Sequence, residues 1–71
     1  MLDGILYNII YSEREGTIRF HNDEKSPMKC SNGERLIGQV QGSEDAYGVA
    51  DVIRILRPDL KTNDSEIVGE E

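Results

Sequence analysis

The chain has 71 residues and a formal net charge of -6 at neutral pH. A chain of this length can form one domain and no second core, and it buries only roughly 60% of the surface that its unfolded state exposes. Its one cysteine and one histidine exclude an internal disulfide and the usual zinc-binding spacings. The apolar stretches are too short for a membrane span, so we expect a cytoplasmic protein with no membrane partner.

Most of the negative charge lies near the C-terminal end of the sequence. Residues 1–58 carry seven Lys and Arg against nine acids, a net of -2, whereas residues 59–71 carry one Lys against five acids, a net of -4. The body of the predicted domain is therefore close to neutral, and a broad acidic surface is not expected on it.

Residues 4–12 alternate and are rich in β-branched and aromatic side chains, which predicts a strand. The polar loop 13–16 ends in glycine and favours a hairpin with a return strand over residues 17–21. A four-residue loop sets Ser12 opposite Thr17, Tyr11 opposite Ile18 and Ile9 opposite Phe20. The large apolar residues of the second strand then share a face with Ile5, Tyr7, Ile9 and Tyr11.

A polar connector, residues 22–27, precedes the strongest turn signal of the chain, Asn32-Gly33. This dipeptide predicts a type I′ turn and a second hairpin between residues 28–31 and 34–41. The two faces of this hairpin are not cleanly apolar and polar, because a two-residue turn sets Met28 opposite Ile37 but Lys29 opposite Leu36. A looser loop is the alternative.

A helix is predicted from Gly42 onward. Ser43 is suited to cap its first N–H groups, two acids follow at the positive end of the helix dipole, and Pro58 ends the helix. Gly48 inside it favours a close approach to the sheet over the alternative of a weaker helix. The expected buried stripe comprises Ala46, Val49, Ala50, Ile53 and Leu56.

These elements predict an α+β domain over residues 1–60: a small antiparallel sheet of three to four strands with one C-terminal helix packed on one face, in the order β-β-β(-β)-α. Residues 61–71 are polar and acidic, with Ile67 and Val68 as one apolar spot, and we expect a disordered tail there.

No motif in the sequence indicates catalysis, and we expect no enzyme and no catalytic, metal-binding or cofactor-binding residue. His21 is expected on the outward face of the sheet beside Asn8, as a surface histidine. Cys30 is expected to pack as a small hydrophobic side chain rather than to react. The loop carboxylates are expected in water, and no phosphate-binding glycine pattern occurs.

The first strand is apolar on both faces, whereas a single helix can cover only one face of a sheet. Our leading hypothesis is therefore a small non-enzymatic protein-interaction module, an accessory, regulatory or inhibitory subunit or a homo-oligomer, which binds through the second face. The expected partner-binding residues are Leu6, Ile10, Tyr11, Arg19, Leu36 and Val40.

The alternative function is a nucleic-acid-associated regulator, either a weak direct binder or an acidic mimic of DNA. Five Lys and Arg lie in the first half of the chain, but interleaved acids cancel their charge, and phosphate binding rests on a net positive surface. The acids are themselves dispersed, whereas a DNA mimic needs ordered rows of carboxylates. Nucleic acid is therefore the less favoured partner.

Overall fold

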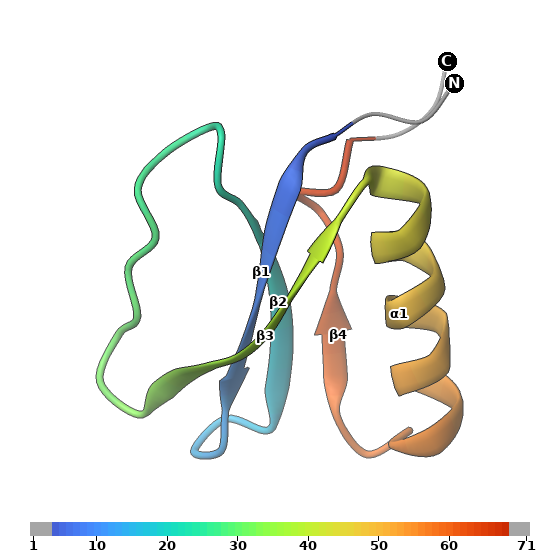
Figure 1. Ribbon diagram of the computed structural model, residues 1–71. Coiled ribbons are helices and arrows are strands. Elements are labelled where there is room, and N and C mark those ends of the chain that lie inside the picture. The colour runs from blue at the N-terminus through green and yellow to red at the C-terminus, as the bar shows by residue number, and fades with distance from the viewer. Residues whose placement is uncertain (1–3, 69–71) are drawn as a thin grey trace.

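In the part of the chain that the structure describes, four strands form one sheet, and a single helix lies across one of its faces (Figure 1). The computed structural model describes residues 4–68. The strands, in the order β3-β1-β2-β4 across the sheet, and the helix confirm the predicted α+β class. Their bounds are β1 Leu6–Ser12, β2 Thr17–Asn22, β3 Glu34–Gln41, α1 Ser43–Leu56 and β4 Lys61–Asn63.

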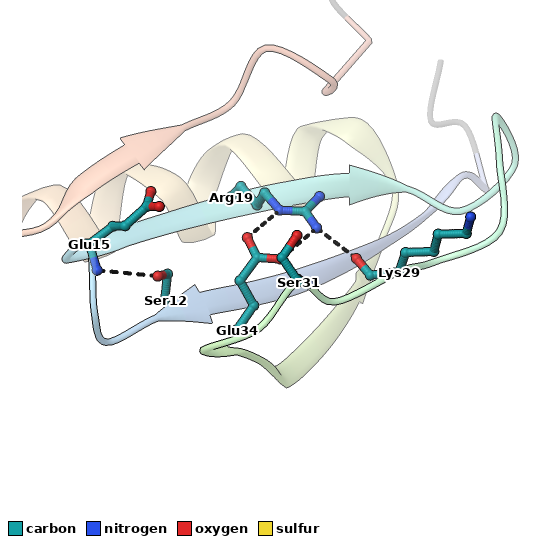
Figure 2. Close-up of polar contacts among 6 residues, drawn as sticks. All are labelled: Ser12, Glu15, Arg19, Lys29, Ser31 and Glu34. Carbon is teal, nitrogen blue, oxygen red and sulfur yellow. Dashed lines mark hydrogen bonds and ion pairs between the residues drawn. The ribbon is translucent and has the colours of Figure 1, made fainter.

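The first hairpin has the register predicted from its loop length. Ser12 pairs with Thr17, and Ile9 pairs with Phe20. The Ser12 carbonyl accepts the Gly16 N–H at 2.8 Å, and Gly16 has a positive φ of 67°, which glycine adopts at low cost. Ser12 Oγ also accepts the backbone N–H of Glu15 at 3.2 Å (Figure 2), so the polar side chain at the end of β1 closes the loop.

The core lies between α1 and the sheet face that the alternation of β1 predicted. Two alanines of the helix are fully buried there, and their small side chains let the helix approach the large residues of β1 and β2 closely. Ile67, from the segment after β4, completes this core. The buried core residues are Tyr7, Ile9, Ile18, Phe20, Ala46, Ala50 and Ile67.

The predicted second hairpin is wrong. Residues 28–31 form no strand, and β3 pairs with β1 instead. In this pairing Leu36 lies opposite the apolar Ile10, whereas the expected hairpin would have set it against Lys29. The Asn32-Gly33 turn is present, since the Glu34 N–H bonds to the Ser31 carbonyl at 2.9 Å. Only Gly33 has a positive φ, 92°, which is typical of a type II turn rather than type I′.

The helix begins and ends as predicted, but its start is built differently. Gly42 is the N-cap residue, with a φ of 96°, and among residues 4–68 no side chain caps the helix. Ser43 Oγ instead lies 2.8 Å from the Tyr7 hydroxyl in the core. Gly48 does not approach the sheet: a Cβ at this position would meet nothing within 4 Å, so the close-packing interpretation is wrong. Leu56, expected in the buried stripe, is 70% exposed.

Residues 61–68 are built into the sheet and core, which differs from the disordered tail expected from residue 61. β4 runs parallel to β2, so the sheet is mixed rather than wholly antiparallel. Ile67 is buried, and Glu66 Oε1 accepts the backbone N–H of Asn22 at 2.9 Å. The polar composition of this segment did not predict these contacts, because they depend on a single apolar side chain, Ile67, and a single carboxylate, that of Glu66. The expected tail residues 69–71 lie outside the described residues.

Candidate interaction surface

The sheet face away from α1 is not the open apolar surface that we expected. In Figure 1 the connector between β2 and β3 lies on the opposite side of the sheet from the helix. Ile10 is only 1% exposed, and Leu6 is half-buried. The expectation that Ile10 needs a partner protein to shield it is therefore wrong, because the chain covers this residue itself.

A network around Arg19 and Glu34 fastens the connector to the sheet (Figure 2). Arg19 Nε and Nη2 donate to the two carboxylate oxygens of Glu34 at 3.0 and 3.2 Å, and Nη2 also donates to the Lys29 carbonyl at 2.8 Å. Glu34 Oε1 accepts the Ser31 N–H at 2.7 Å. These hydrogen bonds lower the pKa of Glu34, and its carboxylate raises the pKa of Arg19. Arg19, an expected anchor for a partner, is thus engaged within its own chain.

A second polar cluster lies under the same connector, centred on His21 and Asn8. These residues pair across β1 and β2 as predicted, but His21 is 5% exposed rather than a surface histidine. Its ring atoms Nδ1 and Nε2 each lie 3.2 Å from a neighbour, Asn8 Nδ2 and Ser26 Oγ respectively. The order Ser26, His21, Asn8 has the outline of a nucleophile, a base and an orienting group.

The orientation of the Asn8 amide decides against that chemistry. Asn8 Oδ1 accepts from Gln39 Nε2 at 2.8 Å, and Asn8 Nδ2 donates to Asp23 Oδ1 at 3.0 Å. The group that faces His21 Nδ1 is therefore a donor, so Nδ1 is the acceptor and the ring proton lies on Nε2, toward Ser26. A histidine that acts as a general base must direct an unprotonated ring nitrogen at the nucleophile. The arrangement fits a structural role in holding the connector.

An exposed apolar surface lies between α1 and the edge strand β3. Two adjoining hollows, of about 590 and 430 Å³, share Ile53, and we call them together the α1–β3 groove. Val52 lines it from the helix, Val40 and Ile37 line it from β3, and Tyr11 lines it from β1. Ile55 and Leu56 follow Val52 by three and four residues, which makes them its neighbours on the helix surface, and they leave large parts of their side chains in water.

An irregularity in β3 exposes one of these residues. The pairing with β1 shifts between Ile9 and Ile10, so that Gly38 and Leu36 have partners and Ile37 has none. Ile37 consequently stands 51% exposed at the groove. Such bulges are common in edge strands, and β3 has only β1 as a neighbour within residues 4–68.

The groove carries opposite charges at its two ends. Glu44 and Asp45 line it beside the start of α1, and neither forms an ion pair with another residue of the described chain. Arg35 and Arg57 line the other end. Arg35 lies over the Tyr11 ring, 5.7 Å from its centroid, and Arg57 pairs with Asp59 at 3.0 Å.

The structure brings two of the six expected partner-binding residues together in this groove, Tyr11 and Val40. Leu36 is exposed on β3 outside the groove lining. Of the other three, Ile10 is buried, Arg19 is hydrogen-bonded within its own chain and Leu6 is half-buried, and none of them lines the groove. Sequence reasoning missed Val52 and Ile55. The available signal was that both lie outside the predicted buried stripe of the helix, where an apolar residue has no partner within the domain.

Comparison with protein-family models, with curated proteins and with solved structures finds no match to this chain. Within residues 4–68, no helix has the length and apolar character that a membrane crossing requires. The same part of the chain holds no group of three or more His, Cys, Asp or Glu placed to bind a metal ion. Cys30 is exposed in the connector, rather than packed as a hydrophobic side chain.

Proposed function

We propose that this protein is a small, non-enzymatic, cytoplasmic interaction module, an accessory or regulatory subunit that binds a protein partner through the α1–β3 groove. The observation that carries this proposal is the exposure of Val52, Ile55 and Leu56 along one helix, beside a groove lined by Val40 and Ile37. Apolar residues that cluster at a hollow are typical of binding surfaces, whereas scattered ones need no explanation.

The size of the patch supports a modest interface. Full burial of a Val, Leu or Ile side chain contributes about 1.5–3 kcal/mol, so a few such residues can offset the several kcal/mol that association costs. The charged ends of the groove would add orientation more than affinity, because exposed ion pairs contribute only about 0–1 kcal/mol each.

The experiment compares Val52→Asp with a matched control, Val68→Asp. Both valines are about half exposed, at 51% and 46%, but Val68 does not line the groove. A photo-crosslinking side chain at Ile55 in each background would report proteins that bind beside the groove in extracts of the native host. We expect crosslinked species in the control that disappear in Val52→Asp. Identical crosslinks in both variants, or none in either, would contradict the proposal.

A further inference from the structure

We infer that the partner in the α1–β3 groove is a second copy of this chain, packed groove to groove about a twofold axis. This inference rests on the proposed function and names its partner. A twofold interface places the same surface of both copies in contact, so that surface must be complementary to itself. The groove meets this requirement in both its charge and its apolar residues.

The charge pattern is complementary to its own rotated copy. Glu44 and Asp45 lie at one end of the groove, and Arg35 and Arg57 lie at the other. A twofold axis through the middle of the groove reverses its direction, so the acidic end of each copy faces the basic end of the second copy. Each dimer then gains two equivalent sets of opposite charges. A parallel arrangement of the grooves would instead set like charges together.

The helix dipole and the side-chain charges have opposite signs at each end of α1. The acids stand at its first turn, where the dipole is positive, and Arg57 follows its last residue, where the dipole is negative. A helix end carries only about half a unit charge, so the full charges of the side chains set the sign of each end of the groove.

The apolar residues lie where the axis would pass. Val52 and Ile53 line the groove between its charged ends, with Ile37 facing them from β3. In the dimer, these residues of one copy contact the same residues of the second copy, and both sets become buried. Leu56 and Ile55, beside the groove, extend the same apolar strip along the helix.

The contact is made by side chains rather than by joined strands. β3 is an edge strand, but its irregularity at Ile37 interrupts the regular spacing of backbone groups that a continuous β3–β3 ladder would need. Bulges of this kind are a common protection against edge-to-edge pairing. The second copy is therefore recognised by the apolar strip and the charged ends.

The first experiment measures mass in solution by sedimentation velocity, from about 1 µM to 1 mM, the range in which modest dimers dissociate. We expect the wild-type chain and Val68→Asp to change from monomer to dimer with rising concentration. Val52→Asp buries one carboxylate from each copy in the apolar middle, and we expect its dimer to be weakened by at least about 100-fold. Far-UV circular dichroism checks that each variant keeps its helix.

The second experiment exchanges charges between the two ends. Asp45→Lys and Arg35→Glu each turn the facing charges into like pairs in their own homodimer, and we expect each dimer to weaken by about tenfold at low salt. An equimolar mixture restores opposite charges at both ends of a mixed dimer. We therefore expect the mixture to associate more tightly than either variant alone, with the difference lost at high salt.

The outcomes separate this inference from the proposed function. A wild-type chain that stays monomeric throughout the concentration range, or a mixture no tighter than its components, overturns the second copy as the occupant. If Val52→Asp then still abolishes the host crosslinks at Ile55, the proposed interaction function stands with a different partner protein. If Val52→Asp changes neither the crosslinks at Ile55 nor the formation of a dimer, both proposals are wrong.

Discussion

The Tyr7 hydroxyl lies 2.8 Å from Ser43 Oγ, and both side chains are buried. This contact joins β1 to the first turn of α1. The same hydroxyl accepts the backbone N–H of Val68 at 3.0 Å, so one oxygen links the first strand, the helix and the segment after β4. Buried polar groups are stable only when they are hydrogen-bonded, and here each of the three segments depends on the others.

Replacing Tyr7 by Phe tests this link. The substitution keeps the ring and removes the hydroxyl, leaving the Val68 N–H and Ser43 Oγ without this partner. We expect the free energy of unfolding to fall by about 1–3 kcal/mol, measured by urea denaturation. Tyr11→Phe is the control, because the Tyr11 hydroxyl forms no hydrogen bond within residues 4–68 and the residue is half-buried. Equal effects of the two substitutions would contradict the special role of Tyr7.

Gly48→Ala is expected to stabilise the protein. Gly48 lies inside α1, a Cβ there meets nothing within 4 Å, and its φ is not positive. Alanine in a helix interior is favoured over glycine by about 1 kcal/mol, which corresponds to a rise of about 4–8 °C in Tm for a domain of this size. Gly42→Ala should have the opposite sign, because Gly42 has a φ of 96°. Thermal denaturation of both variants measures the difference; a Gly48→Ala variant that melts below the wild type would contradict this account.

The cluster around Asn8 is expected to contribute to stability and not to catalysis. Asn8→Leu removes the partner of Gln39, His21 and Asp23 within a buried site, and we expect a loss of about 2–4 kcal/mol in unfolding free energy. Ser26→Ala changes only the exposed end of the cluster and should cost less than about 0.5 kcal/mol. Hydrolysis of a nitrophenyl ester that Ser26→Ala abolishes would contradict the structural interpretation.

The ion pair between Arg19 and Glu34 should make stability depend on pH. The hydrogen bond from Arg19 holds the pKa of Glu34 below its usual 4.5 in the folded state. The folded protein then binds fewer protons at this site than the unfolded chain does, so the stabilisation is complete above the unfolded pKa. It is lost as the pH falls through the lower, folded pKa.

We therefore expect Glu34→Gln to be less stable than the wild type at neutral pH, by about 0.5–1 kcal/mol because the pair is partly exposed to solvent. The difference should shrink as the pH falls below 4.5. Urea denaturation of both proteins across this range measures it. Glu13→Gln is the control for loss of a carboxylate, because Glu13 lies at an exposed loop position and forms no ion pair within residues 4–68. A difference that grows on acidification would reverse the predicted sign.

The parts of the fold that could be predicted from the sequence are those that local patterns determine. The loop length and alternation around Ser12 and Thr17 specified the first hairpin, and the apolar spacing from Ala46 specified the helix. The pairing of β3 with β1 sets Leu36 opposite Ile10, a residue far away in the sequence. Local sequence patterns do not predict contacts between such distant segments. The parallel pairing of β4 is of the same kind.

The sequence predicted an exposed apolar surface, but it did not predict where on the domain that surface lies. An excess of apolar residues over what one helix can cover was evident from β1, yet the connector shields Ile10. The excess lies at Val52, Ile55 and Leu56 instead. The direction in which a polar connector folds depends on hydrogen bonds such as those from Arg19 to Lys29 and Glu34, and composition alone does not give them.

The position of β4 at the far edge of the sheet also bears on how the domain is made. Thr17 pairs with Lys61, so β2 acquires its outer neighbour only after the intervening strand and helix have been synthesised. Contacts that close such long stretches of chain slow folding, because the entropy of loop closure is lost before they form. During synthesis, the outer edge of β2 therefore stays unpaired until residues 61–63 have left the ribosome.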